Sequence, residues 1–485
     1  MRNQRTATIA FFLLVFLLPA AFAQTGDVTG LAKSVLPNGM EVFVLENHVV
    51  PLVRIQITFR CGGMTQTPDT VGLFHLYEHM LFKGNRTFKN QSDFQAAMKE
   101  LGVASWNGGT STESVSYYFT VPADKLEKGI SFWAEAVRYP RFDDAELEME
   151  KSVVINEILG YINDPGNIKS SGEDKAVFWK YPWRKDVGGY EKTIGNATVG
   201  LMRDIQDRYY IPNNAALFVG GDVDPKAVLA IVEKYFGDWQ KRADPWAAAF
   251  PPQAPLTKDV LLVYPDDQMY NGVAEVAVIL RGPDVLDDTA ATYAADVWGT
   301  LIADPNGKFK ADIFAKVPGL YKKEYISAYY ITQRDGGYIQ FETYMLLSSD
   351  GDTLNRAVSL RNAFLEETAA MAADSSFFDA EDYTVLKTKL GDQRILERET
   401  VNGFIGNLSF WWATASSDYY LGYTDTLART GFAELAKYLA DYIVGKNSVL
   451  SVRINPEDFK TEAAAAEKAG FTVLTKDNAY WWGTK

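Results

Sequence analysis

Two histidines and a glutamate in one short stretch offer the clearest chemistry in this sequence. His75 and His79 stand four residues apart in TVGLFHLYEHMLFKG, residues 70–84, and Glu78 directly precedes the second histidine. On an α-helix the two imidazoles lie one turn apart on the same face, with Cβ atoms about 5–6 Å from each other. Imidazoles at that separation can both ligate one zinc ion, and Glu78 is close enough to hold a water on the metal without being a ligand. The spacing therefore predicts a metal site.

The alternative is that the histidines only pack. A single histidine on an apolar helix is more often a core or rim residue than a ligand. The chain has only three histidines in 485 residues, so chance would give about 0.02 pairs at this spacing, and the added glutamate lowers that number about tenfold more. The pair is therefore interpreted as functional. The third histidine, His48, lies in the turn ENHVVP between two apolar runs, and a hairpin turn explains it without a chemical role.

A later acidic segment, residues 143–162, supplies candidates for a third ligand. Glu150 and Glu157 are seven residues apart in it, which is two turns along one face of a helix. Two histidines and one glutamate leave the fourth position of a zinc ion open to water, which is a catalytic arrangement. The spacing alone does not choose Glu157 over Glu146, Glu148 or Glu150.

Hydrophobic periodicity and helix start and stop signals predict the elements that position these residues. Residues 70–84 read as one mostly buried helix, with Pro68 and Asp69 as its start signals. The elements around it are predicted to be a β-hairpin at 40–47 and 51–63, a strand at 114–121 and helices at 94–102, 124–139 and 143–162.

A Pro- and Ala-rich stretch, residues 243–259, divides the chain and is predicted to be a linker. The second half starts with a β-rich run at 273–280 and a helix at 289–301. It ends with a strand and turn at 448–456 that mirror residues 216–225. It therefore looks like a diverged repeat of the first half, and without histidine it cannot rebuild the metal site. The predicted domains are a zinc-bearing 24–242 and a metal-free 260–485.

Residues 1–23 read as a secretory signal peptide. Arg2 and Arg5 precede an apolar run, and Ala21-Phe22-Ala23 forms a cleavage site that places the mature amino terminus near Gln24. The run is about ten residues, well short of the roughly 20 needed to span a bilayer. Cleavage and export are therefore expected, most simply to the periplasm, with no stable membrane span afterwards.

Composition narrows the classes of partner. Loss of the signal peptide removes two of the 48 basic residues and none of the 62 acidic ones, which leaves a net charge of −16. This charge argues against binding to nucleic acid or anionic lipid and mildly favours basic or neutral substrates. The only cysteine, Cys61, can form no disulfide within the chain, so the fold must depend on packing and metal.

HLYEH, followed 78 residues later by the second glutamate of ExxxxxxE, resembles the pitrilysin/insulinase family of zinc metallopeptidases, which includes the mitochondrial processing peptidase. Residues 107–121 and 209–239 resemble segments of the same family, and the similarity covers nearly the whole mature chain. The resemblance implies an α+β fold of two homologous domains, each an antiparallel-rich mixed sheet packed by helices, that together form half of a clamshell.

The resemblance also implies a function and assigns roles. It implies a zinc metalloendopeptidase with one zinc ion per chain and a peptide or small unfolded protein as substrate. That substrate would lie extended as a strand against residues 107–121. The family's functional residues match six positions: the zinc ligands His75, His79 and Glu157, the general base Glu78, the supporting carboxylate Glu150 and the substrate-binding Asn107.

The second half departs from the family pattern. Catalytic members carry an arginine and a tyrosine seven residues apart that grip the substrate carbonyl opposite the zinc. The arginine position falls here on Phe314, and the tyrosine position on Lys322 or, with a gap moved, on Tyr321. Phenylalanine does not replace a planar cationic fork, and Tyr321 reads better as a rim or core residue. A dimer is therefore expected, with a heterodimer whose partner supplies Arg and Tyr preferred over a homodimer.

Two other functions stay open. The chain could be a catalytically silent, zinc-containing binding or assembly subunit, like relatives in respiratory complexes. The missing Arg/Tyr pair favours this alternative, whereas the intact HLYEH with Glu157 argues against it, because an idle subunit has no chemical need for Glu78. A scaffold with a purely structural zinc is weaker still. Structural sites are usually closed by four protein ligands, and no fourth candidate lies nearby in the sequence.

Overall fold

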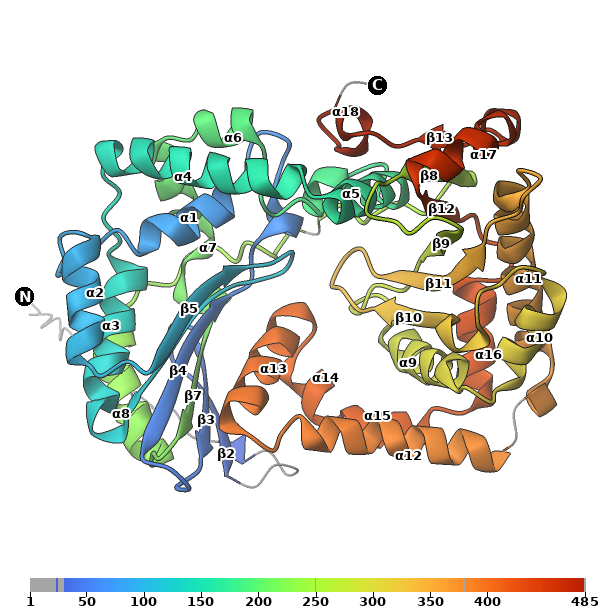
Figure 1. Cartoon of the computed structure of the whole chain (residues 1–485). Coiled ribbons are helices and arrows are strands. Elements are labelled where there is room, and N and C mark those ends of the chain that lie inside the picture. The colour runs from blue at the N-terminus through green and yellow to red at the C-terminus, as the bar shows by residue number, and fades with distance from the viewer. Residues whose placement is uncertain (1–22, 25–29, 249, 378–379, 484–485) are drawn as a thin grey trace, which may run out of the picture.

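Two mixed β-sheets, each with its own helices, make up the chain (Figure 1). The computed structural model describes residues 23–24, 30–248, 250–377 and 380–483. The predicted signal peptide, apart from Ala23, lies outside the described residues. The predicted α+β class is confirmed. Within the described part of the chain, no helix combines the length and the apolar character needed to cross a membrane.

The first sheet ends at a strand with a free edge. Its order is β1-β2-β3-β7-β4-β6-β5, so among the described strands β5 is hydrogen-bonded only to β6. Of its neighbouring strands, β3 and β7 run parallel and the others antiparallel. The strands are β1 (Ala23–Gln24), β2 (Leu31–Val35), β3 (Glu41–Glu46), β4 (Leu52–Phe59), β5 (Ser105–Thr110), β6 (Val115–Pro122) and β7 (Ala215–Gly221).

The described residues of the first half form eight α-helices. Along β4, the alternating Val53, Ile55, Ile57 and Phe59 are fully buried on one face and share a core with residues of α1. The helices are α1 (Leu73–Leu81), α2 (Gln91–Glu100), α3 (Leu126–Arg138), α4 (Asp144–Ile162), α5 (Pro165–Val177), α6 (Glu191–Gly195), α7 (Val199–Tyr209) and α8 (Pro225–Phe236).

The second sheet repeats the topology of the first. The order β8-β12-β9-β11-β10 matches β3-β7-β4-β6-β5, and β8 and β12 are the parallel pair as β3 and β7 are. The repeat expected from the sequence is therefore present in the strand order. The strands are β8 (Val260–Pro265), β9 (Val273–Arg281), β10 (Ser327–Ile331), β11 (Tyr338–Leu346), β12 (Val449–Ile454) and β13 (Thr472–Val473).

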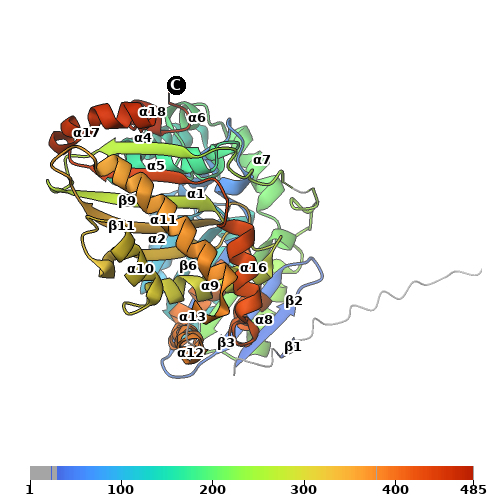
Figure 2. The same cartoon turned by 90° about the vertical axis from the view of Figure 1, so that its right-hand side faces the viewer.

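Helices of the second half cover the outer face of this sheet and reach back to the first half. Figure 2 shows α10, α11 and α16 in front of the second sheet. The helices are α9 (Thr289–Ala303), α10 (Lys308–Lys316), α11 (Thr353–Ala373), α12 (Ala380–Leu396), α13 (Val401–Thr414), α14 (Ser417–Leu421), α15 (Tyr423–Arg429), α16 (Phe432–Tyr442), α17 (Pro456–Ala469) and α18 (Lys476–Ala479).

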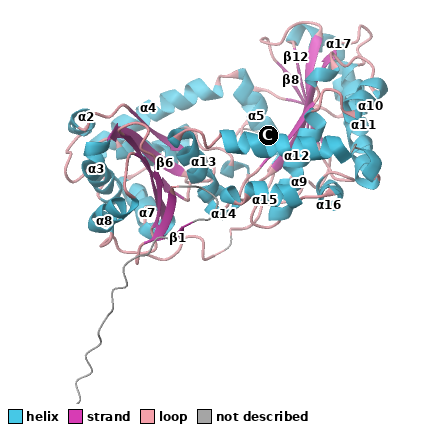
Figure 3. Ribbon diagram, turned by 90° about the horizontal axis from the view of Figure 1, so that it is seen from below, coloured by secondary structure: helices cyan, strands magenta, loops and turns pink. Residues whose placement is uncertain are grey.

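The two halves exchange helices. α5, from the first half, packs on β8, β9 and β12 of the second sheet, and α13, from the second half, packs on β4 and β7 of the first. A buried hydrogen bond of 2.5 Å from the Gln56 amide to Ser409 Oγ ties α13 to β4. Figure 3 shows α13 and α14 between the two sheets. The halves are therefore joined by packing as well as by residues 243–259, of which the described ones form no helix or strand.

The helix that carries the histidines is shorter than predicted. α1 begins at Leu73 after Gly72, whose φ is 81°, so Pro68 and Asp69 do not start it. A side chain at Gly72 would place its Cβ 2.4 Å from the carbonyl oxygen of Gly188. The chain turns here in a left-handed conformation, which a glycine adopts without steric cost. The turn, in close contact with residues 188–189, makes the helix begin later than predicted.

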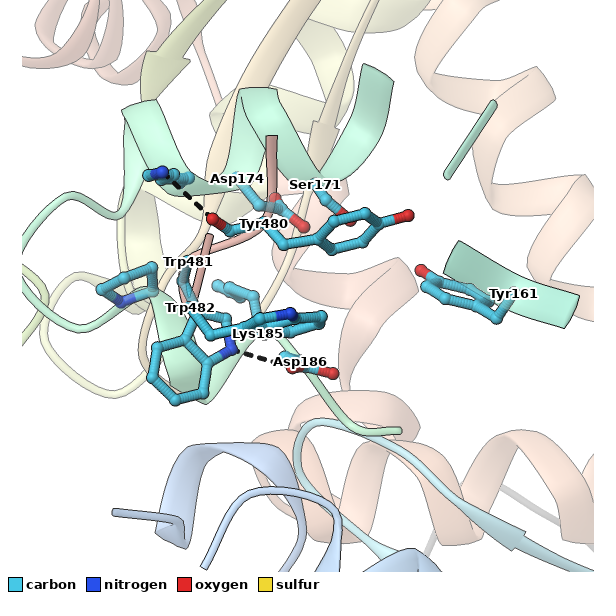
Figure 4. A pocket seen from close by; sticks show the side chains of 10 residues that line it. Tyr161, Ser171, Asp174, Lys185, Asp186, Tyr480, Trp481 and Trp482 are labelled. Atoms are coloured by element: carbon cyan, nitrogen blue, oxygen red, sulfur yellow. Dashed lines mark hydrogen bonds between the residues drawn. The ribbon is translucent and has the colours of Figure 1, made fainter. Parts of the chain in front are cut away.

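The C-terminal segment fastens the end of α4. The Tyr480 hydroxyl donates to the Ile162 carbonyl at 3.1 Å. The Trp481 indole N–H donates to Asp186 at 2.8 Å (Figure 4). Trp482 stacks on Tyr190 with ring centroids 5.0 Å apart. The bond from Tyr480 ties the C-terminal segment to the last residue of α4, the helix that carries the predicted third ligand.

Candidate metal centre

α1 presents its two histidines side by side. Their Nε2 atoms lie 3.2 Å apart, and the rings are nearly perpendicular. Two nitrogens bound to one tetrahedral zinc ion at 2.0–2.1 Å would lie about 3.3–3.4 Å apart. The opposite face of the helix, with Leu73, Tyr77 and Met80, is buried in the core of the first half. Packing therefore fixes the helix in the rotation that points both imidazoles to one place.

α4 brings Glu157 to the same place. Its carboxylate oxygens lie 3.8 Å from His75 Nε2 and 3.6 Å from His79 Nε2. The three side chains offer ligand atoms within 4.8 Å of one another. Because the Glu157 side chain is 57% exposed, the group is open on one side. The donor set and its separations fit one zinc ion with an open position, and ligation by these residues stays a prediction.

Glu150 lies behind His79 rather than in the ligand group. His79 Nδ1–H donates to Glu150 Oε1 at 2.8 Å, and Lys83 Nζ lies 2.5 Å from Glu150 Oε2. Although burial raises it, the bonds from His79 and Lys83 lower the pKa of Glu150 overall, which keeps it ionised. A carboxylate bound at Nδ1 orients the ring and leaves the Nε2 lone pair for a metal.

The two histidines sit in different electrostatic surroundings. Burial and the neighbouring His79 lower the pKa of His75, which favours the neutral ring that a metal ligand must present. For His79, burial lowers the pKa, but the bond to Glu150 and the nearby carboxylates raise it more. Among the described residues, His75 Nδ1 has no hydrogen-bond partner. Only His79 is therefore held by a carboxylate.

Glu78 points from α1 toward β5. Its Oε2 accepts a hydrogen bond of 2.8 Å from the Thr110 hydroxyl. Burial raises the pKa of Glu78, although Thr110 and the charge on His79 lower it in part. A general base works best when its pKa approaches the operating pH. The environment of Glu78 therefore suits proton transfer better than that of an exposed glutamate.

Gly108 makes room for this carboxylate. A Cβ at Gly108 would lie 2.7 Å from Glu78 Oε1 and 2.9 Å from the Phe82 ring. The next residue, Gly109, has nothing within 4 Å of the corresponding position. Only the first of these two adjacent glycines is thus required by the contact with Glu78.

Asn107 is placed on β5 but apart from the ligand group. It is exposed and lies opposite Tyr118 in the pairing of β5 with β6. Successive side chains on a strand point to opposite faces, so Asn107 and Gly108 face opposite ways. Its side chain touches none of the metal-centre residues through a hydrogen bond in the described part of the chain. Its substrate-binding role stays a prediction.

The region that corresponds to the Arg/Tyr pair lies far from the histidines. α10, which carries Phe314, and the segment with Tyr321 are on the opposite side of the molecule from α1 (Figure 1). Both side chains are partly exposed, at 42% and 40%. The Tyr321 ring packs beside Tyr325, with centroids 5.7 Å apart. This region therefore contributes nothing to the metal centre of its own chain.

Two family models match the chain. Residues 42–168 match the insulinase model of peptidase family M16, and residues 196–389 match the model described as the M16 inactive domain. The chain belongs to the M16 peptidase family. All six predicted site residues lie within the first match, so the metal centre falls in the peptidase part of this M16 protein.

Curated zinc proteases are similar to part of the chain. The uncharacterized zinc protease YmxG of Bacillus subtilis is 28% identical over 205 residues, which is 42% of this chain and 49% of that protein. An uncharacterized zinc protease of Rickettsia felis is 26% identical over 203 residues, with the same coverage. The matched part of the chain thus spans about half the length of these relatives. Their names support the protease class and zinc as its metal.

Solved M16 structures share the fold. The first half of the periplasmic protease PqqL from Escherichia coli superposes with a TM-score of 0.73 at 16% identity, covering 92% of this chain and 97% of that one. A protease from Helicobacter pylori gives 0.69 at 17% identity, covering 87% and 98%. The whole of PqqL gives 0.70 at 15% identity and covers 96% of this chain but only 52% of its own.

Three residues at the site escaped the sequence reasoning. Lys83 neutralises Glu150, Thr110 holds Glu78, and Gly108 leaves the space that Glu78 occupies. Thr110 and Gly108 lie in the NGGT segment, within residues 107–121. The resemblance of these residues to the family is the sequence signal that could have drawn attention to them. Their partners are set by how β5 crosses α1, which spacing along the chain does not encode.

The purified chain should bind about one zinc ion, and Glu157→Ala should weaken zinc affinity at least tenfold because it removes a ligand. Competition with a chromophoric chelator measures the affinity, and mass spectrometry of the intact protein gives the stoichiometry. Glu146→Ala on the same helix is the matched control and should bind as the parent does. Equal affinities in the parent and Glu157→Ala would exclude Glu157 as a ligand.

Proposed function

We propose that the chain is a secreted zinc endopeptidase that cuts extended peptides or small unfolded proteins. The proposal rests on one observation, the convergence of two Nε2 atoms and a carboxylate from α1 and α4 beside a half-buried glutamate. His75, His79 and Glu157 would hold the zinc ion. Export to the periplasm is supported by the sequence of residues 1–23, and the structurally similar PqqL is a periplasmic protease by its description.

The residues around the metal divide the work. When bound, zinc acts as a Lewis acid that polarises the scissile carbonyl and lowers the pKa of water at its open position towards 7. Glu78 accepts the proton of the attacking water and passes it to the leaving amine. Thr110 holds the Glu78 carboxylate in place for this transfer, and Glu150 keeps His79 in the orientation that ligation requires.

The free edge of β5 supports the binding of an extended peptide. On the side away from β6, its backbone groups pair with none of the described strands, so a substrate can pair there as an added strand. Such pairing uses main-chain hydrogen bonds and depends little on the substrate's side chains. Asn107 is exposed on this strand, and we assign to it the binding of the substrate backbone.

We further propose that the active species is a dimer. The chain has Phe314 where catalytic relatives carry arginine, and this position lies across the molecule from α1. The whole PqqL chain is nearly twice as long as the part that this chain matches. A second polypeptide that carries the Arg/Tyr pair would complete the site, and a heterodimer fits this better than a homodimer of chains that all lack the arginine.

A silent assembly subunit is the second candidate. The absent arginine favours it, as does the description of the second match as an inactive domain. Against it stands Glu78, which is not one of the proposed ligands yet lies in a space provided by Gly108 and a bond provided by Thr110. A silent subunit needs neither of these contacts.

Glu78→Gln should keep one zinc ion and lose at least a hundredfold in peptide cleavage, because the amide cannot accept the proton of water. The measurement is hydrolysis of an unstructured, quenched fluorescent peptide, with zinc content determined on the same sample. A chelator should abolish the parent activity, and added zinc should restore it. Cleavage by Glu78→Gln at the parent rate would remove Glu78 from the mechanism.

Gly108→Ala should lower kcat at least tenfold with zinc content unchanged, because the added methyl group displaces the Glu78 carboxylate. Gly109→Ala makes the same chemical change one residue further along β5, where space is open, and should cleave as the parent does. The same peptide assay measures both variants. A similar loss in both would mean that strand flexibility, not space for Glu78, is what the glycines provide.

A heterodimer predicts a gain in activity on mixing. The purified chain should cleave peptides at least tenfold faster when an M16 chain from the same organism that carries the Arg/Tyr pair is added, since that chain would supply the missing grip on the carbonyl. Size-exclusion chromatography with light scattering should show a complex of one copy of each. The His79→Ala chain with the same partner is the control and should stay inactive. Full activity of the chain alone would argue for a homodimer.

A further inference from the structure

We propose that Glu113 is a positioning residue through which the second half of the chain sets the place of β5 beside Glu78. Its consequence for catalysis rests on the proposed function, whereas its consequence for the position of β5 does not. The second half has no histidine and so no metal site of the same kind. Through Glu113 it contacts the turn that follows the first half's substrate strand, β5.

The contact joins the tips of two hairpins. Glu113 lies in the turn between β5 and β6, and only 5% of it is exposed. Its carboxylate accepts a short hydrogen bond from the backbone N–H of Arg334, which lies in the loop between β10 and β11. Figure 1 shows these two hairpin tips next to each other in the middle of the molecule. A residue of the first half thus grips the backbone of the second.

The loop that carries Arg334 is itself fixed by the second half. The backbone N–H groups of Gly336 and Gly337 donate to Asp284 at 2.8 and 2.9 Å. The Arg334 guanidinium donates to the Ala413 carbonyl at 2.8 Å and lies over the Trp246 ring. The backbone N–H of Arg334, which donates to Glu113, is therefore held in place by the second half, independently of β5.

The turn between β5 and β6 connects the Glu113 contact to Thr110, which holds the Glu78 carboxylate. On its other side, Met64 N–H donates to the Thr112 carbonyl at 2.8 Å, so the turn is held from both directions. Thr110, three residues before Glu113, donates to Glu78. Because β5 is paired along one edge only, its far end depends on this turn for its position. Loosening the turn would move both the strand and the hydroxyl that holds the base.

A buried carboxylate at position 113 lowers the free energy of unfolding at neutral pH. Burial raises the pKa of Glu113 to about 7, although Thr414, the Arg334 N–H and the charges on Lys185 and Arg334 oppose the rise. A buried acid of raised pKa loses folding free energy as the pH increases from its unfolded value towards 7. A neutral acceptor of the same shape would hold the turn at a lower cost, so Glu113→Gln should preserve the position of β5.

Hydrogen–deuterium exchange of the full, zinc-loaded chain tests the proposal. In Glu113→Ala, exchange in residues 105–110 should become at least tenfold faster, with zinc content unchanged and kcat about tenfold lower. Glu113→Gln keeps an acceptor oxygen and should behave as the parent. Ser409→Ala is the matched control, because it removes another buried hydrogen bond between the halves, to Gln56 on β4, away from β5.

Unchanged exchange in residues 105–110 of Glu113→Ala would overturn the proposal, as would an equal rise in Ser409→Ala. If Glu113→Ala does not fold, Glu113→Asp replaces it, since the side chain shorter by one methylene withdraws the carboxylate from Arg334 and should give a smaller local rise. No rise in Glu113→Asp then overturns the proposal. A parent chain that cleaves no peptide refutes the proposed function, while the exchange measurement still decides whether Glu113 positions β5.

Discussion

The packing of α1 against α4 is the constraint on which the rest of the molecule depends. α1 has nine residues, fewer than the roughly 12–15 that an isolated helix needs to be even marginally stable in water. It exists because its apolar face is buried in the first core, and this burial turns its histidines toward α4. The bond from His79 to Glu150 then joins the two helices directly, with Lys83 balancing the buried charge. Two helices about 70 residues apart in sequence thereby share one chemical centre.

The two halves share one strand topology but have different roles. Each sheet ends at an edge strand, β5 in the first half and β10 in the second. Only β5 lies beside the metal centre, because the second half contains no histidine. The second half contributes α13 against the first sheet and the Arg334 loop against the β5–β6 turn. The second repeat, which has no metal site of this kind, can thus still hold the sheet and the β5–β6 turn of the first repeat in place.

Individual residues show which parts of the fold and of the metal centre can be predicted from the sequence. The His75–His79 spacing and the hairpin before it follow from local periodicity, and local periodicity is what a sequence carries. Spacing alone could not choose Glu157 over Glu150, and only the family resemblance assigned it as a ligand. The crossing of α1 and α4 is what places Glu157 beside both Nε2 atoms and Glu150 beside His79 Nδ1. The late start of α1, after Gly72, comes from contact with a loop over 100 residues later in the chain. Long-range contacts of this kind leave no periodic signal in the chain.

The openness of the metal centre gives the proposed dimer a physical reason. Glu157 is more than half exposed, and β5 offers an unpaired edge, so one side of the site faces solvent in the single chain. Charges that develop during peptide hydrolysis are stabilised best by fixed groups in a site from which water is excluded. The region that would carry the arginine, on α10, lies across the molecule from that side. A second polypeptide that closes over β5 would supply the missing cation and exclude water in the same step.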